Sequence, residues 1–502
     1  MNVSTSTWLI ALPLALSPVI YLWGRLGLRV RRATTMFPWM RWFAVAVLAA
    51  TWIPLVVVAR QVLAGEALAW TAGAVAWRID GLSVVLSFVA LLLGTAVALY
   101  SGPYVAGETG EEKYYTLLLM LVGSMIGLAC TGDLFNLWVW FELMALSSYF
   151  LVAFYRQQPA SLEAGVKYLV QSAAGSVLVL MGISLVLAQT GTLELRAIAE
   201  VANASPALLL AGGLFVVGFG VKVALVPMHT WLPDAHAQAP SGISAMLSGV
   251  VIEAGLVALL RAIAALLPIS LSWGVLLMGF GAINMLAGNL MALRQSQLKR
   301  MLAFSSVSHV GYMLVGLGVG LYAGEAAAAQ GGLFHLINHG IMKGLAFLAA
   351  GAFLYALHVA RGDHAPLTID ELAGAARRYP WAALTLSIAL LGLGGLPPLA
   401  GFMSKWQILV GSARVGTGAI YALIVFTALN SVLSLGYYVP VINAMYRRQP
   451  SQLVLMGADL PRSMVAVMIV LAVLIVVLGV WPGLVQSLTA EGARAVIAAM
   501  GG

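Results

Sequence analysis

The chain has 502 residues, of which 62% are hydrophobic and only 9% are charged. This balance excludes a soluble protein of ordinary composition and indicates an integral membrane protein. The net charge of +8 would suit nucleic-acid binding in a soluble protein, but here it follows from the basic residues of the loops, so no nucleic-acid partner is expected. The single cysteine, Cys130, excludes an internal disulfide and cannot hold a metal alone. We therefore expect no cofactor and no metal.

Apolar runs of about 20 residues, the length that a helix needs to cross the hydrocarbon, recur from Trp8 to Val480. No alternating ten-residue pattern indicates a barrel, so the expected fold class is an all-α polytopic membrane protein with about 14 transmembrane helices. The predicted spans lie near residues 5–24, 42–63, 82–102, 114–131, 133–155, 165–189, 206–226, 244–264, 271–293, 301–322, 329–357, 381–410, 417–439 and 464–485.

The flanks of the spans indicate their orientation. With both termini on the outer side, most arginines and lysines of the loops fall on the cytoplasmic side, as the positive-inside rule predicts. The first span has no basic segment before it and no small-residue cleavage site after it, so we expect it to be retained.

Two predicted spans contain helix-breaking residues. "KVALVPMHTWLP" carries prolines after Lys222, and "LGGLPPLAGFMSKW" carries Gly-Gly and Pro-Pro before Lys405. Proline removes a backbone donor and clashes with the preceding turn, so helices 7 and 12 should break there. Broken helices at corresponding places in two halves of a chain are typical of inverted-repeat transporters.

We therefore expect a single membrane domain over residues 1–502, built around two inverted five-helix repeats. Its expected parts are helices 1–3 in residues 1–113, a first repeat of helices 4–8 in residues 114–264, a second repeat of helices 9–13 in residues 271–439, and a final helix in residues 464–485.

Five acidic or lysine residues are expected near the bilayer centre, where a charge costs about 2.5–3.5 kcal/mol on insertion scales. They are Glu142, Lys222, Glu253, Lys343 and Lys405. A structural ion pair, or a side chain that reaches the interface, would explain one isolated charge. Charges of both signs in separate spans, two of them beside helix breaks, favour a row of titratable groups along which protons move.

Histidines extend this row. "FHLINHGIMKG" places His335, His339 and Lys343 at four-residue steps, so they share one helix face. Neutral imidazole can both accept and donate a proton, which suits a relay. Packing or interhelical hydrogen bonding would also explain a pair of helical histidines. A metal site is the weaker alternative, because no HExxH motif or neighbouring carboxylate supports it.

Three further histidines are candidates for a supporting role. His229 and His236 flank the break in span 7 and are candidates for the route by which protons enter. His309 lies among serines in "SSVSHVGYM", where the hydroxyls could hold water for a relay or simply bond their own backbone.

Five stretches of the sequence resemble one known family. They are "GDLFNLWVWFELMALSSYFLVAF", "KVALVPMHTWLPDAHAQAPSGISAMLSG", "LKRMLAFSSVSHVGYM", "FHLINHGIMKGLAFLAAG" and "GLPPLAGFMSKW". They are similar to the proton-conducting antiporter-like subunits that respiratory complex I, membrane-bound hydrogenases and Mrp cation/proton antiporters share. The match runs from about Asp80 to about Arg447. "DLFNLWVWFE" is most similar to the Mrp D-type subunit, and "ELMALSSYFLVAF" is also similar to the smallest antiporter-like subunit of complex I.

The resemblance implies a fold of 14 helices with inverted repeats around a central hydrophilic axis. By motif, Glu142 matches the family's glutamate in span 5 and Lys222 matches the lysine paired with it in span 7. Lys405 matches the residue of span 12 on the exit side, and His339 and Lys343 match the relay of span 11.

Glu253 departs from the family pattern. The family usually has a lysine in "LLKxGxYxLLR", whereas this chain has "VIEAGLVALLR". This reversal of charge puts a simple lysine-to-lysine relay in doubt. The carboxylate could help to bind a cation such as Na⁺, which prefers oxygen ligands, or it could face a basic residue of a partner subunit.

These features lead to a first expectation of a proton-translocating subunit of a multisubunit complex in the cell membrane, of the Mrp type, which exchanges Na⁺ or another cation for protons and performs no bond chemistry. Its expected partners are other membrane subunits, the lipid bilayer, protons and Na⁺. The alternatives are a proton-pumping subunit of a complex I-like NADH:quinone oxidoreductase or hydrogenase, and a structural scaffold. The residues expected to carry protons are Glu142, Lys222, Glu253, His335, His339, Lys343 and Lys405.

Overall fold

The structure, a computed structural model, describes residues 3–30, 39–66, 68–106, 108–270, 272–362 and 365–497. Twelve of the helices in these ranges are long and apolar enough to cross a membrane, so the predicted all-α polytopic class is confirmed. Two further predicted spans are also helical: span 114–131 is α4 (Glu111–Ala129), and span 381–410 is divided between α15 (Pro380–Gly394) and α16 (Ala400–Ala413). The predicted bounds at residues 1, 271 and 502 lie outside the described ranges.

The N-terminal part contains a β-hairpin that the sequence analysis did not predict. It follows α1 (Val3–Val30) and α2 (Trp39–Leu63), and it pairs β1 (Leu68–Ala72) with β2 (Val75–Ile79) before α3 (Gly81–Val105) begins. The hairpin is held to the turn between α4 and α5 by the Arg78 amide, which donates to the Cys130 carbonyl at 2.9 Å. This turn of the chain is thereby fixed next to the start of α3.

The remaining helices of the first half follow in chain order, and several of them are short. They are α5 (Leu134–Val152), α6 (Pro159–Thr190), α7 (Leu195–Val201), α8 (Pro206–Val223), α9 (Trp231–Gln238), α10 (Ser241–Met246), the π-helical turn η1 (Leu247–Val251), α11 (Ile252–Ala265) and the 3₁₀ turn η2 (Leu267–Ile269).

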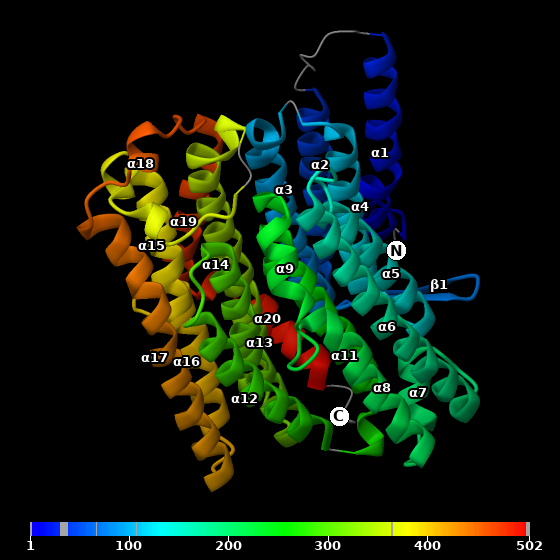
Figure 1. The fold of residues 1–502 in the computed structure, drawn as a ribbon. Coiled ribbons are helices and arrows are strands. Elements are labelled where there is room, and N and C mark those ends of the chain that lie inside the picture. The colour runs from blue at the N-terminus through cyan, green and yellow to red at the C-terminus, as the bar shows by residue number, and fades with distance from the viewer. Residues whose placement is uncertain are drawn as a thin grey trace.

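The second half occupies the opposite side of the molecule (Figure 1). Besides α15 and α16, it contains α12 (Ser272–Ala292), α13 (Leu298–Ala323), α14 (Ala326–Leu357), η3 (Val359–Arg361), η4 (Asp370–Leu372), η5 (Ala375–Arg377), α17 (Gly418–Arg447), α18 (Gln452–Met456), α19 (Arg462–Val480) and α20 (Gly483–Ile497).

Three spans form the centre of the protein. The most apolar window is 100% buried in the span Ser241–Ala265, 100% buried in α13 and 94% buried in α14, against 22% in α17. Side chains on the three central spans therefore face protein on every side, and an ionisable group there is shielded from lipid.

The predicted break in span 7 is present, and the side chain of one asparagine bonds the backbone groups that the break leaves free. After α8 ends, Ala224 has a left-handed backbone with φ +60°, and the chain resumes as α9. Asn284 of α12 accepts from the Val226 amide at 2.9 Å and donates to the Ala224 carbonyl at 3.2 Å. A buried backbone group without a partner is costly, so this side chain stabilises the break.

The predicted break in span 12 lies between α15 and α16 and is also stabilised by an asparagine side chain. Gly395 has φ +82°, and a Cβ atom there would lie 3.1 Å from Cδ of Lys405, so only glycine fits. Asn338 of α14 donates to the Ala400 carbonyl at 2.9 Å. Both interruptions are thus held by an amide side chain from a neighbouring helix, whereas the inverted relation of the two repeats stays a prediction.

The C-terminal part is longer than predicted. The final span 464–485 corresponds to α19, and the amphipathic helix α20 follows it. α20 crosses the middle of the molecule and packs against α3 and α14 (Figure 1). Gly81 permits this approach, since a Cβ atom there would lie 2.3 Å from the backbone of Glu491.

Candidate functional site

Lys222 lies in the last turn of α8, directly before the helix break, and is 1% exposed. Its Nζ donates to the hydroxyl of Tyr168 at 2.7 Å and to Oγ of Ser172 at 3.3 Å, both on α6. The ammonium also lies 4.5 Å from the ring centroid of Tyr168 and 6.0 Å from that of Trp231. Hydroxyl oxygens and ring faces both stabilise a cation, so this pocket suits a charged lysine.

Glu142, the predicted partner of Lys222, lies on the facing helix α5. It is half-buried, and its Oε1 is buried without a hydrogen-bond partner. The ring of the preceding residue, Phe141, lies 5.6 Å from Nζ of Lys222, so α5 reaches the lysine, but the described side chains of Glu142 and Lys222 do not form an ion pair within 4.0 Å. The predicted pair therefore belongs to one site, without direct contact.

Glu253 and His339 form a direct contact at the centre of the protein. Nδ1 of His339 on α14 lies 2.8 Å from Oε1 of Glu253 on α11, and neither side chain is exposed. The other polar atoms of the pair, Oε2 of Glu253 and Nε2 of His339, are buried without a partner. Each residue thus has one atom left to accept or donate a proton.

The position of Glu253 follows from local helix geometry. It lies just after the π-helical turn η1, and such turns are frequent at functional sites. Gly249 of η1 and Gly340 of α14 let the two backbones approach closely, because a Cβ atom on Gly340 would lie 2.8 Å from the Gly249 carbonyl oxygen. The close approach brings Glu253 within reach of His339.

His335 and His309 continue from this pair toward α16. Nε2 of His335 lies 3.0 Å from Nδ1 of His309, and Nδ1 of His335 lies 2.9 Å from Oγ of Ser404. The ring centroid of His309 is 5.2 Å from that of His335 and 5.3 Å from that of His339. The three predicted histidines on α13 and α14 therefore gather in one cluster.

Lys405 lies one residue after Ser404 and is 6% exposed. Its Nζ donates to the Leu393 carbonyl at 2.8 Å and to Oγ of Ser431 at 2.9 Å, and lies 4.6 Å from the ring centroid of Tyr312. The Leu393 carbonyl belongs to the last turn of α15, which the break leaves without an intrahelical partner. The break thus supplies an acceptor for this lysine.

Lys343 lies one turn beyond His339 on α14 and is fully buried. Its Nζ donates to the Leu302 carbonyl at 2.8 Å and to Oγ of Ser305, both on α13. Lys343 therefore shares the helix face of the two histidines, as predicted, but its hydrogen bonds run to α13 and not to His339.

His236 and His229 lie in the segment that follows the break in α8. His236 is fully buried, stacks on Phe347 with ring centroids 4.5 Å apart, and has no hydrogen-bond partner on either ring nitrogen. His229 is 9% exposed, and its Nδ1 is unpaired. Each ring thus has at least one nitrogen atom without a hydrogen-bond partner.

Lys299 is a buried cation that the sequence analysis missed. It begins α13 just before the predicted span 301–322 and therefore looks like a loop residue, yet it is 5% exposed and donates to the Ala239 carbonyl at 2.6 Å. A pocket on the protein surface reaches it, lined by polar residues that include Tyr155, Gln158 and Gln238. Lys299 therefore lines this pocket and is bonded to Ala239, the residue that follows α9.

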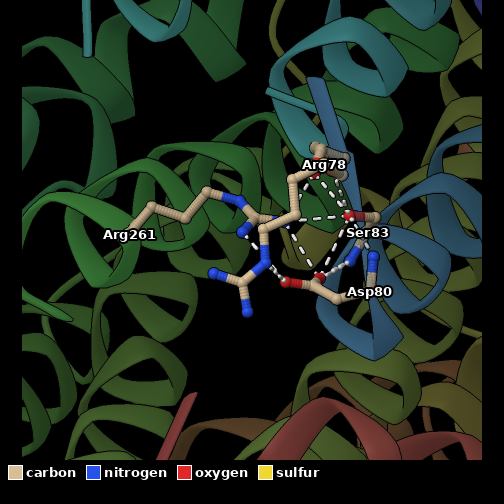
Figure 2. A network of polar contacts seen from close by, with 5 residues as sticks. Arg78, Asp80, Ser83 and Arg261 are labelled. Carbon is tan, nitrogen blue, oxygen red and sulfur yellow. Dashed lines mark hydrogen bonds and ion pairs between the residues drawn. The ribbon is translucent and has the colours of Figure 1, made fainter. Parts of the chain in front are cut away.

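An ion-pair network anchors the C-terminal part of α11, the helix whose first turn carries Glu253. Arg261 donates to both carboxylate oxygens of Asp80 at 3.1 and 3.0 Å, and also to Oγ of Ser83 and to the Ala129 carbonyl (Figure 2). Burial raises the pKa of Asp80, but Arg261 and Arg78 outweigh it and lower that pKa to about 2. The network ties α11 to α3 and to the end of α4.

The site thus contains two connected groups. One group consists of Glu142 and Lys222 with their partners on α6. The other runs from Glu253 through His339 and the histidine cluster to Ser404, joined by hydrogen bonds except between His339 and His309, whose rings stack. Gly255 of α11 packs on the Lys222 side chain, because its Cβ would lie 3.0 Å from Cγ of Lys222, so α11 connects the two groups. In the described residues, no cluster of histidine, cysteine or carboxylate side chains is arranged to hold a metal.

Known proteins share this fold and sequence. Residues 131–434 match the family described as NADH:quinone oxidoreductase/Mrp antiporter, TM, and the chain belongs to this family. It is 34% identical over 425 residues to NADH-quinone oxidoreductase subunit N of Desulforudis audaxviator, an alignment that covers 80% of this chain and 81% of that protein. It is 33% identical over 413 residues to F(420)H(2) dehydrogenase subunit N of Methanosarcina mazei, covering 80% of this chain and 82% of the relative.

Solved structures of the same fold belong to multisubunit membrane complexes. A chain of the membrane-bound sulfane sulfur reductase, an archaeal respiratory complex, superposes with a TM-score of 0.86 at 28% identity and covers 98% of this chain and 97% of its own. A chain of the Mrp complex from Dietzia sp. DQ12-45-1b gives a TM-score of 0.83 at 23% identity with full coverage of both chains. The latter likeness concerns the fold alone.

Proposed function

We propose that the chain is a proton-translocating subunit of a complex I-like respiratory membrane complex, in which partner subunits perform the redox chemistry and this chain moves protons. The observation that carries the proposal is the connected row of buried titratable groups from Glu253 through His339 to the His309–His335 pair. A structural role alone gives no reason to keep unpaired polar atoms such as Oε2 of Glu253 in the centre of a membrane protein.

Proton movement in the second half follows from the chemistry of imidazole. Where His309 Nδ1 and His335 Nε2 meet, one nitrogen donates and the other accepts. Passing a proton across this bond exchanges their roles, and Ser404 on the other side of His335 can donate or accept in turn. Lys405 takes up or releases the proton beyond Ser404, where the break of span 12 supplies the Leu393 carbonyl as an acceptor.

In the first half, Lys222 and Glu142 are the groups that change charge together. Protonation of Glu142 removes the negative charge that favours the ammonium of Lys222, so it promotes release of the proton from Lys222. Lys299 lines the polar pocket, and the buried His236 directly precedes two of the pocket's lining residues, so these two side chains supply the route by which protons enter. His229, beside the break, supports the same route.

The comparisons support a redox-driven complex more than the Mrp-type exchange expected first. The relatives of at least 33% identity named above are subunits N of a quinone oxidoreductase and an F(420)H(2) dehydrogenase. Na⁺/H⁺ exchange of the Mrp type is the second candidate function, because the Glu253 carboxylate has a free buried oxygen and Na⁺ prefers oxygen ligands. We further propose that other membrane subunits flank the chain in the cell membrane and that both termini lie on its outer side.

The test is to purify the intact complex from its native membrane and to identify the partner subunits by mass spectrometry. Proteoliposomes of this complex are then supplied either with the electron donor that the redox partners use or with a Na⁺ gradient, and internal pH is followed with a dye. Donor-driven acidification supports the leading proposal. Na⁺-driven proton movement without redox partners supports the second, and equal transport by a Lys222→Ala complex would leave only a scaffold.

A further inference from the structure

The Lys222 ammonium occupies a hydroxyl pocket on α6 although a carboxylate is near. Its shortest hydrogen bond, 2.7 Å, goes to Tyr168, while Oε1 of Glu142 is buried without a partner. A lysine normally prefers a carboxylate to a neutral hydroxyl, since a hydrogen bond between two charged groups is the stronger one. Something must therefore hold Lys222 on α6.

Tyr168 is itself held firmly in place. Its ring stacks on Trp231 with centroids 4.0 Å apart and planes 6° apart. Nε1 of Trp231 donates to the Val221 carbonyl at 2.7 Å, and the backbone amide of Trp231 donates to Gln171 at 3.1 Å. The tyrosine ring is thus clamped between α6 and the segment that follows the break in α8.

The direction of the hydrogen bonds around Tyr168 is fixed by a backbone carbonyl. Ser148 lies 2.8 Å from the Ala145 carbonyl oxygen, which can only accept, so the one proton of the serine hydroxyl goes there. Ser148 then accepts from Tyr168 at 2.8 Å, and the oxygen of Tyr168 accepts from Lys222. The chain ends at a carbonyl, so it orients the lysine and does not conduct protons.

We infer that Tyr168 is a positioning residue that holds the ammonium of Lys222 apart from Glu142, through its hydroxyl and its ring face. The inference rests on the proposed function, because it concerns the lysine whose charge changes during transport. Separation keeps Lys222 able to release its proton, whereas a direct contact with the Glu142 carboxylate would hold both groups in their charged forms.

Few other groups around Lys222 could hold its ammonium apart from Glu142. α5 presents Glu142, α6 presents Tyr168 and Ser172, α9 presents Trp231, and α11 presents Gly255. Of these residues, Glu142 is the one that carries a charge opposite to that of Lys222. A change in the contact between these two groups is therefore the expected result of removing the Tyr168 hydroxyl.

The test is Tyr168→Phe, which keeps the stacked ring and removes the hydroxyl. We expect donor-driven proton transport by the reconstituted complex to fall on the order of tenfold at neutral pH, as for the loss of a hydrogen bond to a charged group. Activity should recover in part at alkaline pH, where Lys222 can again lose its proton. Tyr100→Phe is the matched control: Tyr100 is a buried tyrosine whose hydroxyl donates to the Leu348 carbonyl at 2.8 Å, and it should leave the pH profile unchanged.

A second variant covers the case in which Tyr168→Phe does not assemble. Ser148→Ala removes the acceptor of the Tyr168 hydroxyl, which makes that oxygen a weaker acceptor for Lys222. Like Tyr168→Phe, it should shift the pH dependence of transport toward alkaline pH, but by a smaller amount. An unchanged pH profile in both assembled variants, or in Ser148→Ala alone if Tyr168→Phe is lost, overturns the inference. A wild-type complex that moves no protons rejects the proposed function instead.

Discussion

Glu253 and His339 meet at 2.8 Å in the fully buried centre of the protein, where the π-helical turn η1 before α11 packs against α14. The carboxylate stands where the family usually has a lysine, and its partner is a histidine on the predicted relay face. The contact therefore connects Glu253, the residue that departs from the family pattern, directly to the predicted relay. This disfavours the expectation that Glu253 serves only to face a partner subunit.

This contact predicts the behaviour of Glu253→Lys. A lysine would place a second positive group beside His339 and the His309 cluster, and like charges at this distance disfavour a protonated imidazole. We expect transport to fall at least tenfold, or its ion and pH dependence to change, while the complex stays assembled; ~1.4 kcal/mol corresponds to that tenfold change. Transport assays over pH and Na⁺ concentration check this. Unchanged profiles in an intact complex would reject the relay role.

Glu142→Gln removes the charge that favours the ammonium of Lys222 and leaves that lysine without an opposite charge in its pocket. We expect proton transport to be abolished while the protein remains inserted and assembled. Glu163→Gln, which changes an exposed carboxylate on α6 that pairs with Lys167, is the control and should transport normally. Wild-type transport by Glu142→Gln vesicles would show that the carboxylate is not required.

Variants of Lys405 test whether this lysine releases a proton during transport or acts only as a fixed positive charge. Lys405→Ala should stop turnover, because the Leu393 carbonyl and Ser431 lose their donor and the path loses its last titratable group. Lys405→Arg should restore little activity, because guanidinium stays protonated. The two variants are compared by single-turnover proton release. Full activity of the arginine variant would mean that only the positive charge is needed.

The ion pair of Asp80 with Arg261 should stabilise the protein in a pH-dependent way. The pKa of Asp80 is lowered from 3.8 to about 2, so this stabilisation is present above about pH 4 and is lost as the pH falls through about 2. Asp80→Asn should lower the free energy of unfolding by about 3 kcal/mol, because it leaves Arg261 partly unpaired in a buried site.

Thermal unfolding of the detergent-solubilised protein measures this effect. Asp459→Asn is the matched control, since Asp459 is fully exposed and lies 3.8 Å from Arg378. Its melting temperature should equal that of the wild type, because an exposed ion pair contributes about 0–1 kcal/mol. Equal melting temperatures for Asp80→Asn and the control would contradict the stabilising role of the network.

Much of the fold could be read from the sequence. The spans follow from long apolar runs, and the two breaks follow from Pro227 and the Pro397–Pro398 pair. The hairpin was missed because the segment 68–79 is as apolar as its flanks and lies next to a predicted span. α20 was missed because it is amphipathic and carries charges, so it has no spanning signal, and its place against Gly81 depends on contacts that are distant in the sequence.

Of the residues of the candidate site, only ionisable ones could be predicted from the sequence. A charge inside an apolar run is visible in a sequence, which is why Lys222 and Glu253 were found. Tyr168 and Ser404 carry no such signal, since hydroxyls are common in membrane helices, and their roles arise from contacts across 54 and 69 residues of chain. Lys299 was missed because it lies at the edge of a span, where a lysine is ordinary.

Asn284 makes the break in α8 a rigid joint. The side chain bonds to Ala224 and Val226 at the start of the break and also donates to the Val307 carbonyl on α13 at 3.4 Å, so the end of α8 is joined to α12 and α13 at this point. The backbone that carries Lys222 therefore has little freedom to bend. We therefore expect movement of its charge between α6 and α5 to come from rotation of the buried lysine side chain, without bending of α8.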